Sequence, residues 1–522
     1  MKKEDLPLLK IDRMKIVTYQ LKLSVCPCMK WGTGYRICLK GEYHLNAVED
    51  VLNDIIGFGN TIFWDYILIY LLIGAGLYFT LGTKFVQFRL FGNMFKVITE
   101  EAVEQSGRRG INAFQAFSIT IASRVGTGNL AGVALAVAIG GPGAVFWMWM
   151  VALVGMATAF IESTLAQAYK IPDKDGFRGG PAYYMQMALG QRWMGVLFSI
   201  LIIITFGLIF NSVQANTISQ AVDQAFNIDP MWTGFVLVAL AGIVIFGGIK
   251  RIATVAGAIV PFMAFIYILV ALYVVITNIT EVPAVFSLIF KDAFGLEQAF
   301  GGGAGAAIMY GIRRGLFSNE AGMGSAPNAA ATVGVSHPAK QGLVQSLAVF
   351  FDTIVICSFT AFIVILYDNF YGASEDGIQL TQVALDAHIG AFGSIFLAII
   401  IFFFAFSSLV GNYYYGETNI AFLKNNPIML NIYRVIVLGM IMFGSLASVQ
   451  IVWNMADLFM ALMAVVNLIA ILLLGRVAFR ILQDYVDQKK EGIDPQFHYS
   501  RIKGLKNVEW WGMQDEKNQP PK

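Results

Sequence analysis

The chain has few charged side chains. Asp, Glu, Lys and Arg make up 13% of its 522 residues, whereas hydrophobic residues make up 57%. A soluble protein of this length would carry about 25% charged residues. Together with the positive mean hydropathy, this composition predicts a polytopic membrane protein. The formal net charge of +2 gives no indication of a nucleic-acid partner.

Cysteines and catalytic motifs are also scarce. Four cysteines are too few for a disulfide framework, and Cys26-Pro27-Cys28 lacks the second pair that would complete a zinc site. The sequence contains no Walker A motif, which argues against ATP-driven transport by this chain alone. A Gly-x-Ser-x-Gly elbow and a His/Glu metal pair are missing as well. We therefore predict a protein that is not an enzyme and carries no resident cofactor.

Long apolar segments recur along the chain, and a membrane-spanning helix needs roughly 20 such residues. We predict about eleven spanning helices, at residues 62–81, 113–139, 140–168, 183–217, 231–248, 252–276, 300–316, 343–367, 389–415, 428–448 and 451–479. Residues 84–103 place aromatic and basic side chains at helical spacing, which predicts an amphipathic helix at the membrane surface. Residues 1–44 are basic with weak periodicity, and we treat them as an atypical N-terminal extension.

Loop charges predict the orientation, because Lys and Arg concentrate in cytoplasmic loops. The basic linkers 83–112, 169–181 and 250–251 and the tail 480–522 fall on one side of an eleven-span protein. Two linkers that contain Asp or Glu but no Lys or Arg fall on the other side, at residues 218–230 and 368–388. We predict a plasma-membrane protein with its N-terminus outside and its C-terminus in the cytoplasm. The basic extension runs against this rule, since it would lie outside.

Two of the apolar segments are interrupted. Residues 123–129 place Arg124, two glycines and three further polar side chains inside segment 113–139, and residues 301–305 place four glycines inside segment 300–316. In lipid, unwound backbone survives only where it is buried in protein or lines a wet cavity. The ends of the half-helices then present N–H and C=O groups of opposite partial charge, which can hold a carboxylate and a cation.

The spacing of the two interruptions predicts an internal repeat. When the first span and its linker, residues 46–112, are set aside, ten spans remain, in residues 113–278 and 297–479. Each half opens with a broken helix, and an odd number of spans gives the halves opposite orientations. This pattern predicts an inverted-repeat transporter with its site at the two breaks. The alternative is that the glycines serve only close helix packing.

Four sequence runs strongly resemble the alanine/glycine:cation symporter family. They are Gly-Pro-Gly-Ala-Val-Phe-Trp-Met-Trp at 141–149, Ser-Arg-Val-Gly-Thr-Gly-Asn at 123–129, Ser-Asn-Glu-Ala-Gly-Met-Gly-Ser-Ala-Pro at 318–327 and Gly-Asn-Tyr-Tyr-Tyr-Gly-Glu at 411–417. The resemblance covers about residues 46–490. It implies an all-α LeuT-type fold with a 5+5 inverted repeat, coupling to sodium, and a small neutral amino acid such as alanine or glycine as substrate.

The chemistry of a zwitterion agrees with this resemblance, because its buried carboxylate and ammonium both need partners. We predict that backbone N–H groups at the first break receive the carboxylate, and that carbonyls at the second break receive the ammonium. Two amides one helical turn apart, Asn211 and Gln214, could face the same cavity, and the resemblance favours Gln214; an interhelical hydrogen bond is the alternative. The predicted substrate contacts are Gly126, Thr127, Gly128, Asn211, Gln214, Gly301, Gly302, Gly303, Ser408 and Asn412.

Sodium prefers hard oxygen ligands. In a LeuT-type fold, Ser407 and Ser408 would complete a cation site with carbonyls of the first broken helix, and Ala122 and Val125 are the predicted carbonyl donors. Serines inside helices also commonly bond to their own backbone, which is the alternative for both hydroxyls.

Ionisable residues inside spans are costly and therefore point to function. Asp352 lies near the middle of the eighth segment, and we expect it either to join a cation site or to pair with Arg124 or Arg314, with pairing favoured. An inner gate network is predicted from Arg313, Arg314 and Glu320. Glu162 and Glu417 lie near segment ends and are expected to cap or anchor helices.

Asn412 departs from the family pattern. Alanine-transporting members are expected to have a tryptophan here that closes the pocket over a small side chain. Asparagine leaves more room and could hydrogen-bond a longer amide side chain, so glutamine is a rival substrate. A site built to bond an amide rejects substrates that lack one more strongly than an apolar pocket rejects an extra methylene.

The sequence therefore predicts a sodium-coupled symporter that imports a small neutral amino acid by alternating access, with glutamine as the alternative substrate. An ion channel is a less favoured alternative, because channels usually build a continuous pore from rings of groups supplied by several subunits. The predicted partners are the amino acid, the sodium ion and the lipid bilayer.

Overall fold

The computed structural model describes residues 53–512 apart from short gaps, and these residues belong to one compact unit, Val51–Lys522. The gaps are 102–103, 106–107, 110, 174–175, 248, 296–302, 368–369, 371–376, 425 and 503–504; the side chains of 104–109 and 249–261 are not described either. The predicted extension 1–44 lies outside the described residues, as do Gly301 and Gly302.

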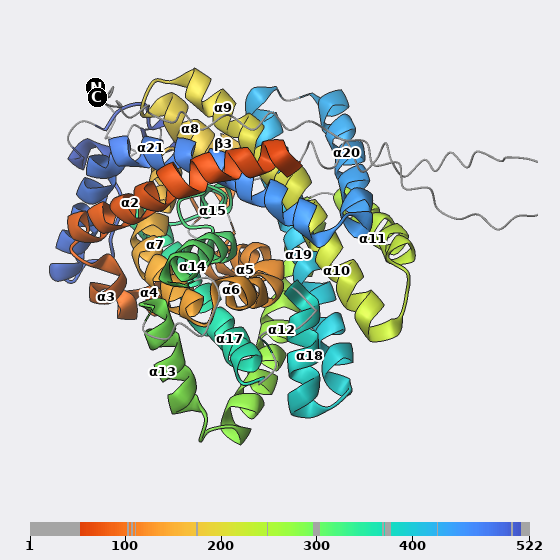
Figure 1. The fold of residues 1–522 in the computed structure, drawn as a ribbon. Coiled ribbons are helices and arrows are strands. Elements are labelled where there is room, and N and C mark those ends of the chain that lie inside the picture. Colours follow the sequence, from red (N-terminus) through yellow and green to blue (C-terminus); the bar gives the residue numbers. More distant parts are fainter. Residues whose placement is uncertain are drawn as a thin grey trace, which may run out of the picture. The chain divides into compact units, whose positions relative to one another are not determined.

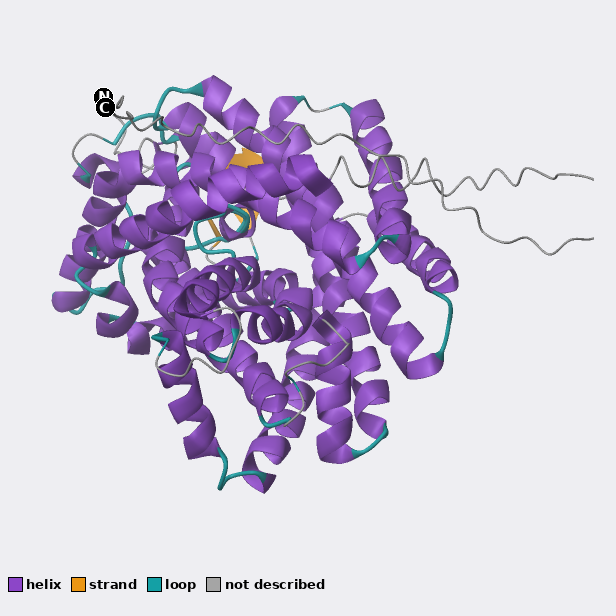
Figure 2. Cartoon of the chain, viewed as in Figure 1, coloured by secondary structure: helices purple, strands orange, loops and turns teal. Residues whose placement is uncertain are grey.

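Helices account for nearly all of the regular structure in the described residues, and the strands form two short antiparallel hairpins (Figure 2). β1 (Glu104–Gln105) pairs with β2 (Arg108–Arg109), and β3 (Ile171–Asp173) pairs with β4 (Gly176–Arg178). Both hairpins lie in the predicted basic linkers, so neither interrupts a predicted span.

The first half of the chain is helical throughout most of the predicted segments. In chain order they are η1 (Thr61–Leu68), α2 (Ile69–Gly82), α3 (Val86–Arg89), α4 (Phe91–Ile98), α5 (Ala113–Arg124), η2 (Gly128–Gly132), α6 (Val133–Gly140), α7 (Gly143–Ala168), α8 (Pro181–Met187), α9 (Arg192–Ile202), η3 (Ile203–Phe210), α10 (Asn211–Phe226), α11 (Pro230–Ile245), α12 (Ile249–Thr277) and α13 (Val282–Ala293).

The second half is helical in the same way. Its helices are α14 (Gly303–Asn319), α15 (Ala326–Ala330), α16 (Pro338–Val349), η4 (Phe350–Cys357), α17 (Ser358–Ile365), α18 (Gly377–Ile389), α19 (Phe392–Leu423), α20 (Pro427–Leu446), α21 (Val449–Lys490) and the short η5 (Tyr499–Arg501). The η elements other than η5 are π-helical stretches within longer helices.

Local sequence sets several of the helix starts. Asn112 and Gln115 form a reciprocal capping box at the first turn of α5. Asp229 and Asn426 each accept a hydrogen bond from a backbone N–H of the first turn of α11 and α20, and a proline follows at the first helical position. The start of the broken segment is therefore encoded by its own residues.

The chain is a multi-pass membrane protein. Among the described residues, seven helices are long and apolar enough to cross a bilayer, or up to nine if two bent pairs each count as one span. The bent pairs are Ala113–Arg124 with Gly128–Gly140, at 52°, and Phe262–Thr277 with Val282–Ala293, at 100°. α11 is a shorter apolar helix. The predicted total of eleven spans stays a prediction.

The structure corrects several predicted boundaries. Segment 183–217 is divided, because α8 ends at Met187 and a new helix, α9, begins at Arg192. Two helices were not predicted: α13 follows the sixth segment, and α18 lies within the predicted acidic linker 368–388. α21 continues to Lys490, past the point where the tail was expected to begin. The two short helices that were not predicted are stabilised by packing that composition alone does not reveal, α13 against α7 and α18 against α19.

The interrupted helix lies among helices from both halves of the chain. α14 packs against α6 and α7, while α5 and α10 both pack against α19 (Figure 1). Most buried hydrophobic residues of these helices belong to one continuous core. The break between α5 and η2 is thus surrounded by protein, as unwound backbone within a membrane requires.

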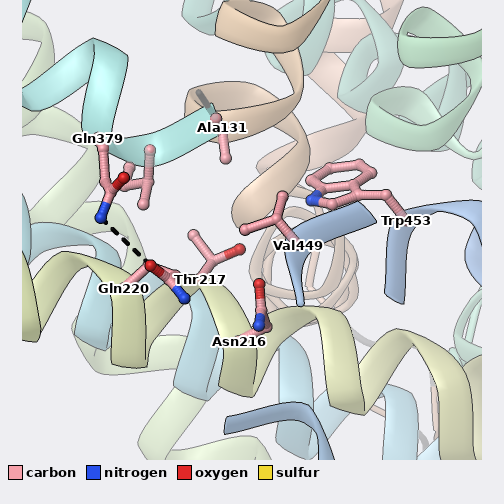
Figure 3. Close-up of a pocket in the computed structure, with 9 residues that line it drawn as sticks. Ala131, Asn216, Thr217, Gln220, Gln379, Val449 and Trp453 are labelled. Carbon is pink, nitrogen blue, oxygen red and sulfur yellow. Dashed lines mark hydrogen bonds between the residues drawn. The ribbon is translucent and has the colours of Figure 1, made fainter. Parts of the chain in front are cut away.

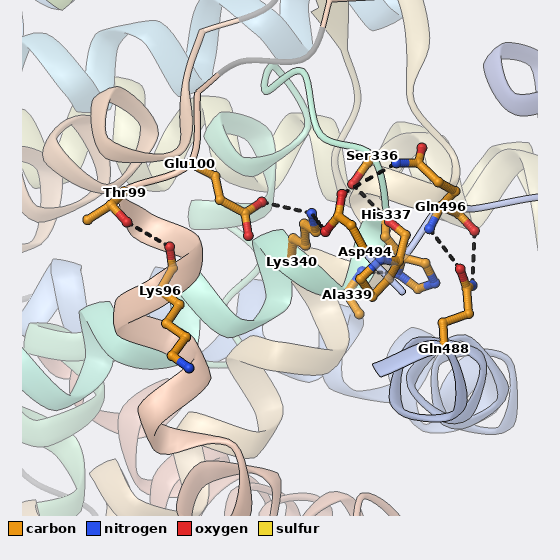
Figure 4. A network of polar contacts seen from close by, with 11 residues as sticks. Lys96, Thr99, Glu100, Ser336, His337, Ala339, Lys340, Gln488, Asp494 and Gln496 are labelled. Carbon is orange, nitrogen blue, oxygen red and sulfur yellow. Dashed lines mark hydrogen bonds and ion pairs between the residues drawn. The ribbon is translucent and has the colours of Figure 1, made fainter. Parts of the chain in front are cut away.

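Linkers that are far apart in sequence meet at one end of the unit. Lys340, at the start of α16, bonds both to Glu100 and to Asp494, each at 2.8 Å (Figure 4). The backbone N–H of Phe497 donates to the carbonyl oxygen of Ser336 at 2.9 Å. The linker 83–112 and the tail 480–522 therefore lie at the same end, which agrees with the common side predicted for them.

Candidate functional site

The helical hydrogen bonding of the first broken segment ends where predicted. α5 ends at Arg124, and Val125 adopts an extended conformation, with φ −73° and ψ 97°. The N–H of Gly126 donates to Asn129 Oδ1 at 3.1 Å, and the N–H of Thr127 donates to Gln214 Oε1 at 3.3 Å. These N–H groups have left the helical pattern and are held by side-chain oxygens, which an incoming carboxylate could replace.

The two predicted cation-binding serines of α19 face the carbonyls at this break. Ser408 Oγ lies 2.9 Å from the carbonyl oxygen of Ala122 and 3.4 Å from that of Val125. Ser407 Oγ lies 3.2 Å from the same Ala122 oxygen. Both hydroxyls also bond to the carbonyl of Phe404 in their own helix. The structure thus brings together four hard oxygen atoms, two from α19 and two from the end of α5.

Gly126 has no room for a side chain. A Cβ atom at this position would lie 2.5 Å from Ser408 Oγ and 3.0 Å from Gln214 Oε1. At Gly128 a Cβ atom would lie 3.0 Å from the Phe317 ring and 3.1 Å from the Cα atom of Ser318. At Gly132, farther along the same helix, the nearest atom is 3.5 Å away, which is ordinary van der Waals contact. The tightest position is therefore the one that faces the predicted site residues.

Several buried polar atoms around the break have no hydrogen-bond partner among the described residues. They include Thr127 Oγ1, Asn211 Oδ1 and Asn412 Nδ2. Asn412 is 1% exposed, and its Oδ1 accepts from Ser123 Oγ at 3.4 Å, which leaves the amide nitrogen as a free donor. Unsatisfied buried polar groups are rare and costly, so their grouping here indicates a place for a polar ligand.

The predicted interruption at residues 301–305 lies partly outside the described residues. Gly303 is the first residue of α14 and has φ 62°, outside the helical range, whereas Ala304 and Gly305 belong to the first turn of that helix. A break follows α14 after Asn319, beyond the predicted segment 300–316, where Glu320, Gly322 and Gly324 have φ of 56°, 91° and 85°. Gly303 lies about 24 Å away along the helix, at 1.5 Å per residue. The family resemblance had singled out residues 318–327, at the C-terminal end of α14. The break was predicted instead at its N-terminal end, because glycines are concentrated there.

Asp352 does not form the expected ion pair. This fully buried carboxylate accepts hydrogen bonds from Asn129 Nδ2 at 2.8 Å, from Ser318 Oγ at 2.6 Å and from Thr353 Oγ1 at 2.8 Å. Within the described part of the chain, no cationic group lies within ion-pair distance of it. Pairing with Arg124 or Arg314 was the favoured prediction, but the register of the helices brings Asn129, Ser318 and Thr353 to this carboxylate instead.

The predicted gate residues separate into two groups. Arg313 and Arg314 both pair with Asp457 of α21, at 3.3 Å for Arg313, and their guanidinium groups lie over the rings of Trp64 and Trp453. Glu320 instead accepts a hydrogen bond from a nearby serine hydroxyl at 2.5 Å. The prediction of one network joining these residues is therefore wrong. Asp457 was missed, although a carboxylate inside segment 451–479 was a sufficient signal.

Arg124 is a buried cation beside the break. Its Nη1 donates to the carbonyl of Gln345 at 3.4 Å, and its Nε and Nη2 atoms have no partner among the described residues. It lies close enough to interact electrostatically with Glu162, Glu320 and Asp352. Glu162 does more than anchor a helix end, because it accepts from the N–H of Gly322 in the second break and from an amide of α21.

A small pocket lies beside η2, the helical stretch that follows the first break. Ala131, Thr217, Gln220 and Trp453 are among its lining residues, and Gln220 accepts a hydrogen bond from a glutamine of α18 (Figure 3). An aromatic cluster extends from this pocket toward the break: Trp453 contacts Phe317 with ring centroids 4.7 Å apart, and Phe317 contacts Phe210 at 4.6 Å. The Phe317 ring is also the nearest group to a Cβ built on Gly128.

Comparison with known proteins gives consistent matches over nearly the whole chain. A family model described as the sodium:alanine symporter family matches residues 49–499. The amino-acid carrier protein AlsT of Bacillus subtilis is 56% identical over 472 residues, which cover 90% of this chain and 100% of AlsT. The probable sodium/glutamine symporter GlnT of the same organism is 52% identical, covering 90% and 98% of the two chains. The sodium/alanine symporter AgcS of Methanococcus maripaludis is 39% identical, covering 80% and 94%.

Proposed function

The chain belongs to the sodium:alanine symporter family, and from this premise we propose that it imports a small neutral amino acid together with sodium by alternating access. One observation carries the proposal: the hydroxyls of Ser407 and Ser408 face the carbonyls of Ala122 and Val125 beside the break at Gly126. Carbonyl and hydroxyl oxygens are the ligands that hard cations prefer.

Sodium at this position would connect the two halves of the protein. Its carbonyl ligands come from α5 in the first half, and its hydroxyl ligands come from α19 in the second half. Binding would therefore stabilise the arrangement in which the two halves lie close together. A ligand shifts a conformational equilibrium only by its preference for one state, and a bridging ion has such a preference.

The amino acid would bind beside the ion at the same break. The N–H groups of Gly126 and Thr127, which now donate to side-chain oxygens, can donate instead to its carboxylate, with the unpartnered Thr127 hydroxyl as a third donor. Gln214 Oε1, which now accepts from Thr127, would turn to accept from the ammonium group. The carboxylate and the sodium ion would then lie on adjacent residues of one unwound segment, so that each charge favours binding of the other.

Alanine and glycine are the first substrates to test, and glutamine is the second candidate. The observation that favours glutamine is the buried Asn412 amide nitrogen without a partner, which could donate to a side-chain carbonyl. We expect Asn412→Trp to fill that space and to lower glutamine transport relative to alanine transport. Equal alanine-to-glutamine ratios in wild type and Asn412→Trp would contradict the role given to this residue.

Uptake into proteoliposomes tests the whole proposal. Labelled alanine, glycine and glutamine are supplied under an imposed sodium gradient, an imposed proton gradient or neither. Saturable uptake that requires the inward sodium gradient supports a symporter. Uptake that does not saturate, or that is indifferent to both gradients, would instead support a channel and sink the proposal.

We also propose that the C-terminus is cytoplasmic and the N-terminus outside, with the tail packed on the cytoplasmic linkers. The support is the loop charge pattern together with the contact of Lys340 with Glu100 and Asp494. A C-terminal tag should be digested by protease in inside-out vesicles and protected in intact cells. The reverse pattern would overturn the orientation without affecting the transport proposal.

A further inference from the structure

The chain that follows α21 folds back over the linkers at one end of the protein. We call the described part of residues 494–511 the strap. Asp494 pairs with Lys340 at 2.8 Å, and the backbone N–H of Phe497 donates to the carbonyl oxygen of Ser336 at 2.9 Å (Figure 4). The strap is therefore bonded to the linker that joins α15 to α16, in the second half of the chain.

The strap also contacts the first half of the chain. Phe497, Trp510 and Trp511 are all buried, and the rings of Phe497 and Trp511 contact each other. Trp511 Nε1 donates to the carbonyl oxygen of Gln167, near the end of α7, at 3.0 Å. The ring of Trp510 contacts the ring of Phe177 in β4, with centroids 4.8 Å apart. Burial of large apolar rings against both halves holds the strap in place.

The linker under the strap ties the two broken segments together. α5 leads into the first break, and α15 leads out of the second. Val333, which follows α15, forms a parallel bridge with Ile111, which precedes α5. The N–H of Gly334 donates to the carbonyl oxygen of Ile111 at 3.2 Å. α5 and α15 also pack against each other, so a path from this end to the break at Gly126 requires the two helices to separate.

A buried cation opposes closure of the strap. Lys170 is fully buried, its ammonium donates to the carbonyl oxygen of Val333 at 2.8 Å, and it lies 4.1 Å and 5.2 Å from the ring centroids of Phe177 and Trp511. Among the described residues no carboxylate lies within ion-pair distance of it, and burial holds the pKa of Lys170 well below its usual value. Removing an ammonium from water is costly without an anionic partner. Release of the strap would return this group to water, so closure is not favoured without limit.

We propose that the strap is a releasable latch on the cytoplasmic exit of the transporter. In the closed state it covers the linker between α15 and α16 and keeps α5 and α15 together. Its release lets these two half-helices separate, so that the amino acid and sodium can leave the break toward the cytoplasm. This inference rests on the proposed function and on the proposed orientation, because an exit at this end is needed only by an importer whose tail is cytoplasmic. The strap biases the conformational equilibrium because it bonds to both halves only while they are close.

The first test measures whether α5 moves when the strap is weakened. Thr120 lies in α5 between its tied end and the break, is fully buried, and accepts a hydrogen bond from Gln345 of α16 at 2.9 Å. A water-soluble maleimide can reach Thr120→Cys only when α5 moves away from its neighbours. Labelling is measured on the full-length protein in detergent, and the labelling of the parent protein without Thr120→Cys is subtracted.

Trp511→Ala should raise the rate of labelling at Thr120→Cys by on the order of tenfold or more, because truncation of a buried tryptophan costs more than one factor of ten in equilibrium. Lys170→Met should lower the rate, because it removes the buried charge while Gln167 still donates to the Val333 carbonyl at 3.1 Å. Glu509→Ala is the matched control: this exposed side chain belongs to the same segment, and its removal should leave the rate unchanged.

The second test locks the strap. Ser336→Cys and Phe497→Cys are combined, because the backbones of these residues are hydrogen-bonded to each other. Sodium-driven amino-acid uptake into proteoliposomes is compared in the oxidised and the reduced protein. Cross-linking should nearly abolish uptake, and reduction should restore it. The same protein is measured in both states, so a folding defect cannot produce the difference.

The latch is overturned if the cross-linked protein transports as fast as the reduced protein, or if Trp511→Ala leaves the labelling rate unchanged. A lower thermal unfolding midpoint in Trp511→Ala with unchanged labelling would give the strap a stabilising role only, which also overturns the inference. A wild-type protein without sodium-dependent uptake would refute the proposed function instead, and the labelling experiment would still report whether the strap holds α5 in place.

Discussion

Replacing Ser408 by alanine is the most direct test of the cation site. The substitution removes one hydroxyl oxygen that lies 2.9 Å from the Ala122 carbonyl and 3.4 Å from the Val125 carbonyl. Ser408 is fully buried, and its Oγ is the atom nearest to a Cβ built on Gly126. The change therefore takes one of four oxygen atoms from the proposed site and leaves the backbone ligands in place.

The expected size of the effect follows from the energy of one interaction with a charged group. Such an interaction contributes about 1.5–3 kcal/mol, and every 1.4 kcal/mol is a factor of ten in binding. The half-saturating sodium concentration for uptake should thus rise about 10- to 100-fold in Ser408→Ala. Ser407→Ala should have a smaller effect, because its hydroxyl approaches one carbonyl of the break, at 3.2 Å, instead of two.

The assay is amino-acid uptake into proteoliposomes at saturating substrate over a range of sodium concentrations. Ser445→Ala is the matched control: Ser445 is also buried and bonds to a carbonyl of its own helix, at 3.1 Å, but it lies on α20 and is not bonded to the break. An equal sodium dependence in Ser408→Ala and Ser445→Ala would refute the cation site. The hydroxyl would then serve only its own helix, as buried helical serines often do.

Three further predictions concern the break, the buried ion pair and pH. Gly126→Ala should abolish or greatly weaken transport, whereas Gly132→Ala, with its nearest neighbour at 3.5 Å, should transport normally; equal activity in the two variants would show that the glycines serve packing alone. Asp457→Asn should destabilise the purified protein by about 3–5 kcal/mol, because it leaves two buried arginines without their counter-ion; an unchanged thermal unfolding midpoint would contradict this. Burial holds the pKa of His337 below its usual value, so the folded state binds fewer protons than the unfolded state and stability should fall as pH drops below about 6.5. His337→Gln should reduce that loss when thermal unfolding midpoints at pH 7.5 and 5.5 are compared, and an equal loss in both proteins would assign it to other groups.

Local patterns in the sequence predicted the positions of the helices better than the contacts between side chains of different helices. The segment 113–139 was predicted to be a broken helix because glycines and polar residues interrupt an apolar run, and the structure confirms a break within residues 125–127. The same logic failed for Gly305, which lies in the first turn of α14, although Gly303 at the start of that helix has a positive φ of 62°. Ser407 and Ser408 were placed opposite Ala122 and Val125 through family resemblance, and the structure brings these atoms together.

The sequence alone determined that this protein lies in a membrane as a set of helices, one of them interrupted by Gly126 and its neighbours. Composition and period are properties of contiguous residues, so they carry this information directly. Only the tertiary structure decided that Asp457 pairs with Arg313 and Arg314, and that Asp352 bonds to Asn129 and Ser318. Those pairings depend on the rotation and register of helices, several of which are more than a hundred residues apart in the sequence. Long-range packing sets that register, and the charge of a single residue does not reveal it.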